Sequence, residues 1–240
     1  MKKYKILIGT PISEYKANVL PKWLSYVKSL VRSYENSKNI ELHILLCDNS
    51  QNQAFHKQLS RKYNVPVIYS NPMFKNSREF IADSRNRILD TFLQKDYTHF
   101  LSLECDIFPH SNFLSTLIAH NKQVIGMPYF IGDKVDSFPM IQILDKIKTY
   151  PIETKNISLD EMFLNTGALM KVFNAGLGCT LIKRNVLENI KFRFDNDINL
   201  HDDSFFAEDI YLKGISYWLE TEHLLRHLNK PWNYFPKNKF

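Results

Sequence analysis

The chain has 240 residues, 44% of them hydrophobic, which is enough for one large domain with a substantial core. It contains no apolar run long enough to span a bilayer and no signal-peptide pattern, and its three cysteines lack the spacing of a disulfide framework or a zinc site. We therefore expect a reduced, cytoplasmic protein without a transmembrane segment.

The formal net charge is +6, and lysines are concentrated at both ends of the chain (Lys2, Lys3, Lys5, Lys237 and Lys239). This balance indicates either a solvated lysine-rich surface or a preference for anionic partners, including peripheral contact of the basic termini with a membrane. No basic stripe interleaved with aromatic residues is present. We therefore expect no nucleic-acid partner.

The first half of the chain alternates strand-like and helix-like patterns. Strands are expected over 5–8, 40–46, 65–69, 99–103 and 124–127, and helices over 20–34, 54–63, after Asn76 and after Ser111. This order predicts an α/β fold in which helices flank a mostly parallel central sheet. Ligands of such sheets bind beyond the carboxyl ends of the strands.

The second half is less regular. Residues 132–166 mix polar residues and proline with scattered apolar ones, and we interpret them as a loop or flap. Strands are expected over 169–173, 179–182 and 215–219, with a short helix from Asn185 and a longer one over 205–213. We see no internal repeat and no linker.

The tripeptide Glu104-Cys105-Asp106 directly follows an expected buried strand. Side chains two residues apart in an extended segment point the same way, so Glu104 and Asp106 can converge. Mg²⁺ and Mn²⁺ prefer such oxygen ligands and commonly complete their shell with phosphates. The alternative is an ordinary solvated acidic turn.

Neither GxGxxG nor a P-loop follows the first strand, which argues against a dinucleotide fold and a P-loop kinase. Asp48, at the end of the second expected strand, suits a hydrogen bond from a base imide or a ribose hydroxyl, or else a turn-forming role. Arg78 and Arg85 lie seven residues apart on one expected helix, where they suit diphosphate binding or a solvated face.

Glu208-Asp209 is expected in the first turn of its helix, where the helix dipole alone accounts for two acids. The functional interpretation makes Asp209 a general base. His227 is a candidate nitrogen ligand for a metal, although a histidine in such a tail is more often a surface or core residue.

Taken in order, these segments resemble the GT-A class of nucleotide-sugar glycosyltransferases, most nearly the inverting family 2 enzymes. The similar segments are Lys5–Pro11 (opening strand and nucleotide turn), Leu46–Ser50 (second strand), Ala82–Arg87 (helix before the metal motif), Phe100–Asp106 (strand ending in D-x-D), Asn174–Ile182 (acceptor-side strand) and Phe206–Asp209 (E-D motif). The sequence departs from the family in Glu104, which replaces the usual first Asp. His223 also competes with His227 for the metal.

The resemblance implies a GT-A-type Rossmann-like fold with a nucleotide-sugar half over 1–128 and an acceptor half of the same domain over 129–240. It implies metal-dependent transfer of a sugar, with inversion, from a nucleotide diphosphate donor to a glycan, lipid-linked or protein hydroxyl. In this family the usual donor is a UDP-sugar. The implied residues are Thr10, Pro11, Asp48, Arg78, Arg85, Glu104, Cys105 and Asp106 for the donor, Glu104, Asp106 and His227 for Mn²⁺ or Mg²⁺, Asp209 as base, and Gly176, Gly178 and Glu208 on the acceptor side. The alternatives are a sugar nucleotidyltransferase and a non-catalytic nucleotide- or carbohydrate-binding protein.

Overall fold

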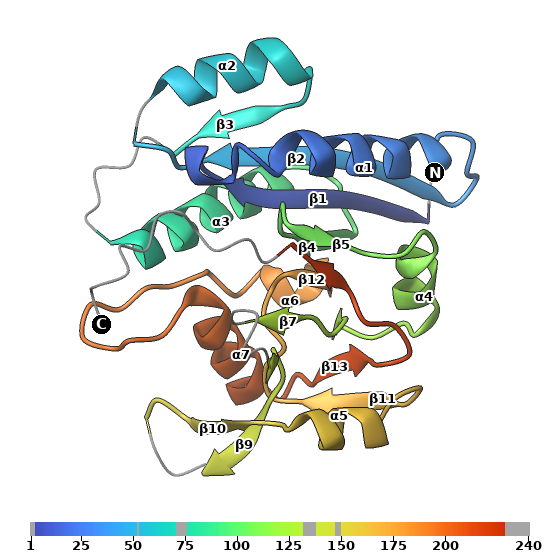
Figure 1. The fold of residues 1–240 in the computed structure, drawn as a ribbon, viewed down its shortest axis with the longest axis vertical. Helices are drawn as coiled ribbons and strands as arrows, with labels where there is room; N and C mark the ends of the chain where they lie inside the picture. The colour runs from blue at the N-terminus through green and yellow to red at the C-terminus, as the bar shows by residue number, and fades with distance from the viewer. Residues whose placement is uncertain (1–2, 52, 71–75, 132–137, 147–149, 229–240) are drawn as a thin grey trace.

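A central sheet of eight strands runs through the computed structural model, which describes residues 3–51, 53–70, 76–131, 138–146 and 150–228 (Figure 1). In spatial order the strands are β11 (Leu169–Val172), β13 (Tyr217–Glu220), β6 (Val124–Gly126), β12 (Cys179–Lys183), β4 (His99–Leu103), β1 (Tyr4–Ile12), β2 (Ile40–Asp48) and β3 (Val67–Tyr69). Strands β1 to β4 are parallel, β12 runs against both β4 and β6, β13 is parallel to β6, and β11 is antiparallel to β13. The prediction of an α/β fold around a mostly parallel sheet is confirmed.

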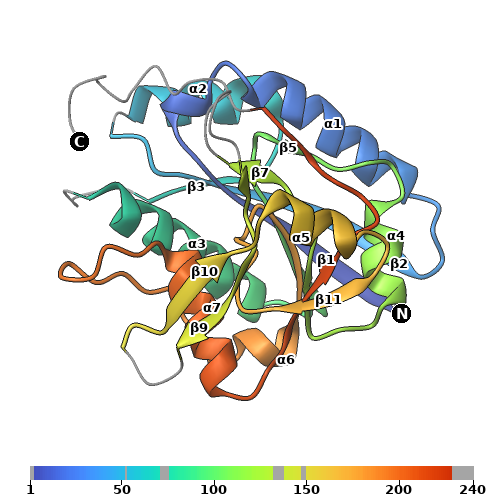
Figure 2. The ribbon, with the colours of Figure 1, turned by 60° about the horizontal axis from the view of Figure 1, so that its bottom comes forward.

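Two hydrophobic cores form because side chains of a strand alternate between the faces of the sheet. Ile6 and Ile8 of β1 belong to the core that contains residues of α1 (Leu20–Ser33), α2 (Gln53–Tyr63) and α4 (Phe113–Ala119). Leu7 belongs to the other core, with residues of α3 (Ser77–Leu93), α6 (Arg184–Leu187) and α7 (Asp202–Leu212). Helices α3 and α7 lie side by side in both views (Figures 1 and 2). The sheet is thus covered on both faces.

The interpretation of 132–166 as a loop is wrong for the described part of this segment. It contains β8 (Phe138–Pro139), which pairs with β7 (Phe130–Ile131), the hairpin of β9 (Gln142–Lys146) and β10 (Glu153–Asn156), and α5 (Leu159–Leu164). The hairpin was missed because its strands are largely exposed and lack a buried apolar face. The start of α5 has a capping box, in which Ser158 and Glu161 exchange hydrogen bonds, a three-residue spacing visible in the sequence. Residues 132–137 and 147–149 lie outside the described residues.

Helix α7 begins at Asp202, three residues earlier than expected. Asp202 and Asp203 occupy its first turn, where the positive end of the helix dipole favours acidic residues. Glu208 and Asp209 therefore lie in the middle of the helix, and the expectation that they form its first turn is wrong. This shift decides which acids of α7 lie at its N-terminus.

Strands from both sides of residue 128 share the sheet, since β12 of the second half pairs with β4 and β6 of the first. A further short pair joins β5 (Ile107–Phe108) to β14 (Arg226–His227).

Among the described residues no helix is long and apolar enough to cross a membrane. Cys47, Cys105 and Cys179 are buried free thiols. Of the basic chain ends considered for membrane contact, Lys2, Lys237 and Lys239 lie outside the described residues.

His99, the first residue of β4, makes the stability of the fold depend on pH. It is 9% exposed, and burial together with nearby Lys183 lowers its pKa from 6.5 to about 4. Because the pKa of His99 is lower in the folded state than in the unfolded state, the folded state binds fewer protons in this range. The free energy of unfolding therefore has its full value above pH 6.5 and decreases as the pH falls toward 4. We expect His99→Gln to remove up to about 3 kcal/mol of the difference in unfolding free energy between pH 7 and pH 4. Urea titrations of both proteins at these pH values measure it; equal pH dependence would contradict the assignment.

Candidate functional site

The carboxyl ends of β1, β2 and β4 meet at one edge of the sheet. Ile12 of β1 pairs with Asp48 of β2, and the Thr10 hydroxyl donates a 2.7 Å hydrogen bond to the Leu103 carbonyl of β4. Thr10, Asp48 and the segment 104–106 therefore lie at the same edge, as the strand pattern predicts. Two strand spacings separate Asp48 from the end of β4, or roughly 10 Å, a span that a nucleoside diphosphate can bridge.

Asp106 and His227, far apart in the sequence, are brought together by the β5–β14 pair. His227 lies opposite Ile107, and the Leu228 amide donates to the Asp106 carbonyl at 2.9 Å. His227 Nε2 is then 3.4 Å from Asp106 Oδ2, and Nδ1 is 2.6 Å from the Phe130 carbonyl. A carbonyl accepts hydrogen bonds only, so the second contact keeps the proton on Nδ1. Nε2 therefore faces Asp106, and it carries a proton toward this carboxylate when the ring is charged.

The Asp106 carboxylate is 4% exposed and is held ionised by its neighbours. Burial raises its pKa, but His227 and the Lys16 ammonium, which bonds to Oδ2, outweigh this and set the pKa below its ordinary value. The same pairing raises the pKa of His227 although burial opposes it. Asp106 Oδ1 is buried and has no hydrogen bond to a described residue.

These features fit a divalent cation such as Mn²⁺ or Mg²⁺. A buried carboxylate with one unpaired oxygen and an imidazole nitrogen whose other nitrogen bonds to a carbonyl are what such a site provides. His223 is elsewhere: its ring stacks on His110 at 3.9 Å and its Nδ1 is 3.5 Å from Glu220. Of the two competing histidines, His227 is the one beside Asp106.

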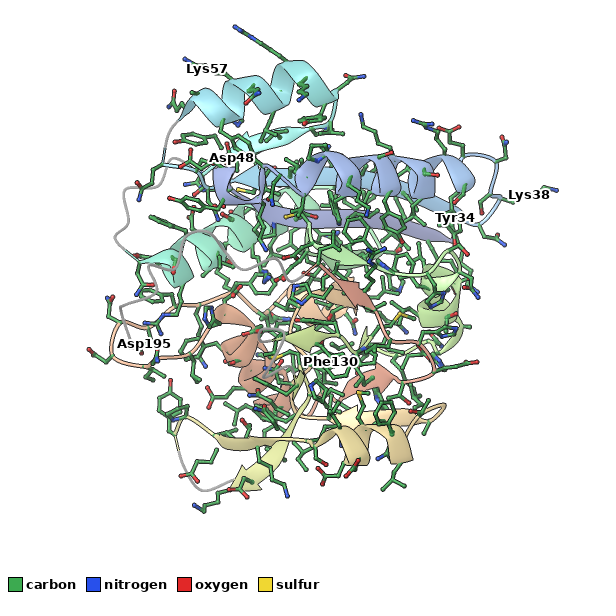
Figure 3. All side chains as sticks on the ribbon, viewed as in Figure 1. Tyr34, Lys38, Asp48, Lys57, Phe130 and Asp195 are labelled. Atoms are coloured by element: carbon green, nitrogen blue, oxygen red, sulfur yellow. The ribbon has the colours of Figure 1, made fainter. Side chains whose placement is uncertain are left out.

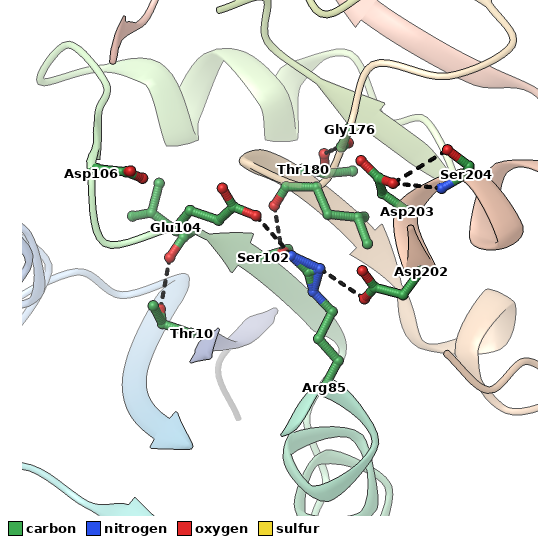
Figure 4. A network of polar contacts seen from close by, with 12 residues as sticks. Thr10, Arg85, Ser102, Glu104, Asp106, Gly176, Thr180, Asp202, Asp203 and Ser204 are labelled. Atoms are coloured by element: carbon green, nitrogen blue, oxygen red, sulfur yellow. Dashed lines mark hydrogen bonds and ion pairs between the residues drawn. The ribbon is translucent and has the colours of Figure 1, made fainter. Parts of the chain in front are cut away.

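Glu104 turns away from Asp106 and toward Arg85 (Figure 4). The Arg85 guanidinium is 3% exposed and bridges two carboxylates, with 2.8 Å from Nη2 to Glu104 Oε1 and 3.1 Å from Nη1 to Asp202 Oδ2. Arg85 thus comes from α3, Glu104 from the end of β4, and Asp202 from the first turn of α7. The guanidinium ties together three elements at the edge of the sheet.

Negative charge exceeds positive charge around Arg85. Asp203 is the third carboxylate of this group, and in Figure 4 it lies beside Thr180. Burial raises the pKa of Asp202 to about 7 against the opposing charge of Arg85, and burial likewise raises that of Asp203. Asp203 Oδ1 accepts the Ser204 amide at 2.7 Å. The Arg85 group thus holds three carboxylates next to the strand end.

Asp209 is not part of this group. Both of its oxygens accept from Arg193, at 2.9 to 3.2 Å, and Arg193 also binds buried Glu208 at 2.9 Å. Asp209 follows Asp202 by seven residues, so the two share a helix face but are about 10 Å apart along the axis. Glu208 Oε1 also accepts the Ile152 amide at 3.1 Å, which ties α7 to the segment before β10.

The Asp48 carboxylate is fully buried and forms a second polar centre at the end of β2, close to α2 (Figure 3). Its Oδ1 accepts the Ser50 amide at 2.9 Å and the Ser50 hydroxyl at 2.6 Å. Its Oδ2 has no hydrogen bond to a described residue and is 3.8 Å from His56 Nδ1. Burial raises the pKa of Asp48, opposed by the Ser50 hydrogen bonds. An N–H donor of a ligand at this position would supply the hydrogen bond that Asp48 Oδ2 lacks.

The glycines expected on the acceptor side form a turn that leads into β12 and packs against Tyr129. Gly176 has φ +68°, and a Cβ there would lie 2.2 Å from the Tyr129 hydroxyl; at Gly178 it would lie 2.7 Å from the ring. The Gly178 carbonyl accepts the Glu104 amide at 2.9 Å. The turn thus fixes the end of β4, which carries Glu104.

The remaining predicted donor residues are less available. The Cys105 thiol packs in the core beneath α1 and cannot face a ligand. Arg78 Nη1 donates to the carbonyls of Ile198 and Leu200, at 2.7 and 3.2 Å. Pro11 is a half-buried residue within β1.

Sequence reasoning missed Lys16, Asp202, Asp203 and Tyr129 as site residues. The Asp202-Asp203 pair had a visible signal, because two acids at a helix start suit its dipole. Lys16 follows a strand by four residues and Tyr129 comes from an irregular segment, so neither has a local pattern that reveals its position.

No protein-family model matches the chain, and no curated protein matches it. Among solved structures it is similar to A197 from STIV, with a TM-score of 0.50 and 18% identity over 94% of this chain and 86% of that one. It also aligns with a CMP:2-keto-3-deoxy-manno-octonic acid synthetase complexed with CTP, with a TM-score of 0.46 and 10% identity over 90% of this chain and 88% of that one. The first likeness shows the fold alone, and the second is too weak to add to it.

Proposed function

We propose that the protein transfers a sugar from a nucleotide diphosphate donor, a UDP-sugar by the resemblance of its motifs, to a hydroxyl acceptor in a reaction that requires Mn²⁺ or Mg²⁺. The observation that supports this most is the Asp106–His227 pair at the carboxyl end of β4, with one carboxylate oxygen unpaired and the histidine tautomer fixed by Phe130. Asp48, roughly two strand spacings away at the same edge, suits the base or ribose of the nucleotide.

On the donor side, Asp106 and His227 would hold the cation, which would supply positive charge to neutralise the leaving diphosphate. Lys16, now paired with Asp106, is close enough to share its charge with the phosphates. The buried Asp48 Oδ2 accepts an N–H or O–H of the nucleoside, which removes an unpaired buried oxygen. Both Nη atoms of Arg85 are engaged, by Glu104 and Asp202, so we assign Arg85 the part of orienting Glu104 rather than of binding phosphate directly.

On the acceptor side, a carboxylate of α7 takes the proton of the attacking hydroxyl. The motif resemblance assigns this base to Asp209, but both of its oxygens bind Arg193. We assign it to Asp203, which is half-buried and whose pKa burial raises above its ordinary value, the direction that makes a carboxylate a stronger base. Its position in the Arg85 group brings it to the end of β4 that holds Glu104.

The two assignments predict opposite outcomes for matched substitutions. We expect Asp203→Asn to lower kcat by roughly 100-fold or more without weakening donor binding, the loss typical of a removed general base. Asp209→Asn should change kcat much less, since Glu208 still pairs with Arg193. Steady-state kinetics with calorimetric donor binding measure both effects. The reverse ranking would return the role of base to Asp209.

Product analysis tests the reaction itself. Incubation with UDP-sugars, Mn²⁺ and glycan or lipid-linked acceptors should release a nucleoside diphosphate and yield a glycosylated acceptor. Consumption of a nucleoside triphosphate with release of pyrophosphate would instead identify a nucleotidyltransferase. Metal-dependent nucleotide binding without either product, over a broad donor panel, would identify a binding protein.

A further inference from the structure

A second group of metal-ligating side chains lies at the carboxyl end of β13. Glu220, Glu222 and His223 each offer one ligand atom, and these atoms lie within 4.8 Å of one another. The end of β13 is three strand spacings from β4, the strand that precedes Asp106, with β6 and β12 in between. The distance across the sheet is roughly 14 Å. The group shares no residue with the Asp106–His227 pair.

Glu220 is the observation that points to a ligand here. It is 3% exposed, and its Oε1 accepts the Glu222 amide at 2.7 Å. Its buried Oε2 has no hydrogen bond to a described residue, although it is only 3.5 Å from His223 Nδ1. An unpaired oxygen on a buried carboxylate costs free energy unless a cation or a donor reaches it.

The His223 nitrogen that faces Glu220 is unpaired as well. Nδ1 is buried and has no hydrogen bond to a described residue. The ring stacks on His110, with 3.9 Å between ring centroids and 25° between their planes, so its orientation is fixed. Two ligands of a tetrahedral zinc ion at ordinary bond lengths are about 3.4 Å apart, close to the observed separation of this nitrogen and the Glu220 oxygen.

The backbone around the group is also held in place. The Thr221 hydroxyl contacts the carbonyls of Asn165 and Ala168, both at 2.6 Å, and the Leu225 amide donates to the Pro128 carbonyl at 2.9 Å. Only Glu222 is exposed and free to rotate toward an ion. Two of the three ligands are thus preorganised and the third can close on the ion.

We propose that Glu220, Glu222 and His223 bind a Zn²⁺ ion, with water in the fourth position. One imidazole nitrogen and two carboxylate oxygens suit zinc, whereas magnesium and calcium prefer oxygen ligands alone. The ion would anchor the segment that leads into β14, the strand that carries His227. This site does not depend on the proposed transfer reaction.

Zinc binding by the full chain tests the proposal, measured by calorimetry and by metal content after dialysis. The His227→Ala background removes zinc binding at Asp106. In it we expect one equivalent of Zn²⁺, with Kd raised by roughly 100-fold or more in His223→Ala and Glu220→Gln, beyond the usual effect of losing an outer-shell partner. Glu222→Gln, an exposed substitution that leaves the core intact, should also weaken binding.

His43→Ala is the matched control, because His43 pairs with Glu41 at 2.6 Å on the surface without belonging to this group. It should bind zinc like its parent. The absence of a bound equivalent in the parent, or unchanged zinc affinity in both Glu222→Gln and His223→Ala, would overturn the proposal. The readout is metal binding alone, so failure here leaves the proposed transfer activity untouched.

Discussion

Replacing Arg85 by methionine is expected to lower the free energy of unfolding by about 3–5 kcal/mol at pH 7, the cost of breaking a buried ion pair. The substitution leaves Asp202 buried and unpaired, and Glu104 loses its partner. Methionine fills most of the arginine volume, so lost packing is a minor contribution. The measurement is urea unfolding, with native spectra confirming that the variant folds.

The pH dependence of this loss identifies its cause. Without Arg85 the pKa of Asp202, already raised to about 7 by burial, rises further in the folded state. A carboxyl that binds its proton more tightly when folded stabilises the protein as the pH falls. Asp202 titrates at about 7 in the parent and above 7 in the variant, so Arg85→Met should recover stability relative to the parent as the pH falls from the alkaline side toward 7, and the difference should level off below that.

Arg87→Met is the control for Arg85→Met. Arg87 is on the same helix, and its side chain is 44% exposed and pairs with Asp83 four residues away. Such a pair contributes about 0.5 kcal/mol. Equal losses in the two variants, or a loss below about 1 kcal/mol for Arg85→Met, would contradict the role of Arg85 as the tie between β4, α3 and α7.

Replacing Asp106 by asparagine is the second large effect. We expect it to lower transfer by roughly a thousandfold, comparable to the removal of a group that stabilises developing charge. Asparagine keeps the shape of the side chain but presents a neutral oxygen to the cation. Steady-state kinetics over a range of Mn²⁺ concentrations measure the loss.

Asp96→Asn controls for the loss of a carboxylate as such. Asp96 is exposed and pairs with Lys5, before the start of β4 rather than beyond its end. Transfer should be unchanged in this variant. An Asp106→Asn enzyme that keeps its activity and its metal dependence would remove Asp106 from the site.

Much of the fold was predictable because its first half has regular local patterns. Strands such as 5–8 and helices such as 20–34 show apolar residues at the spacing of a strand or a helix, and α1 begins at the expected Leu20. The segment 138–164 was not predictable in the same way. The β9–β10 hairpin is stabilised by pairing between exposed strands, and such pairing requires no regular spacing of apolar residues in the sequence.

The site was predictable in part. Thr10 and Asp48 lie in the last residues of their strands and Asp106 lies just beyond one, and a parallel sheet brings such ends to one edge. The pairing of His227 with Asp106 depends on β14 reaching back over more than a hundred residues to β5, which no local pattern shows. Likewise, the direction of Glu104 depends on Arg85 and Asp202, two residues on different helices.

The most direct test of the account is thermal unfolding of the protein with UDP, with and without Mn²⁺, repeated for Asp106→Asn. We expect UDP at a hundred times its Kd to raise Tm by roughly 5–10 °C when Mn²⁺ is present. The shift should be small without the metal and absent in Asp106→Asn. A panel of other nucleoside diphosphates covers the choice of base. If none of them produces a metal-dependent shift, or if Asp106→Asn keeps the full shift, the metal–diphosphate site at the end of β4 is contradicted.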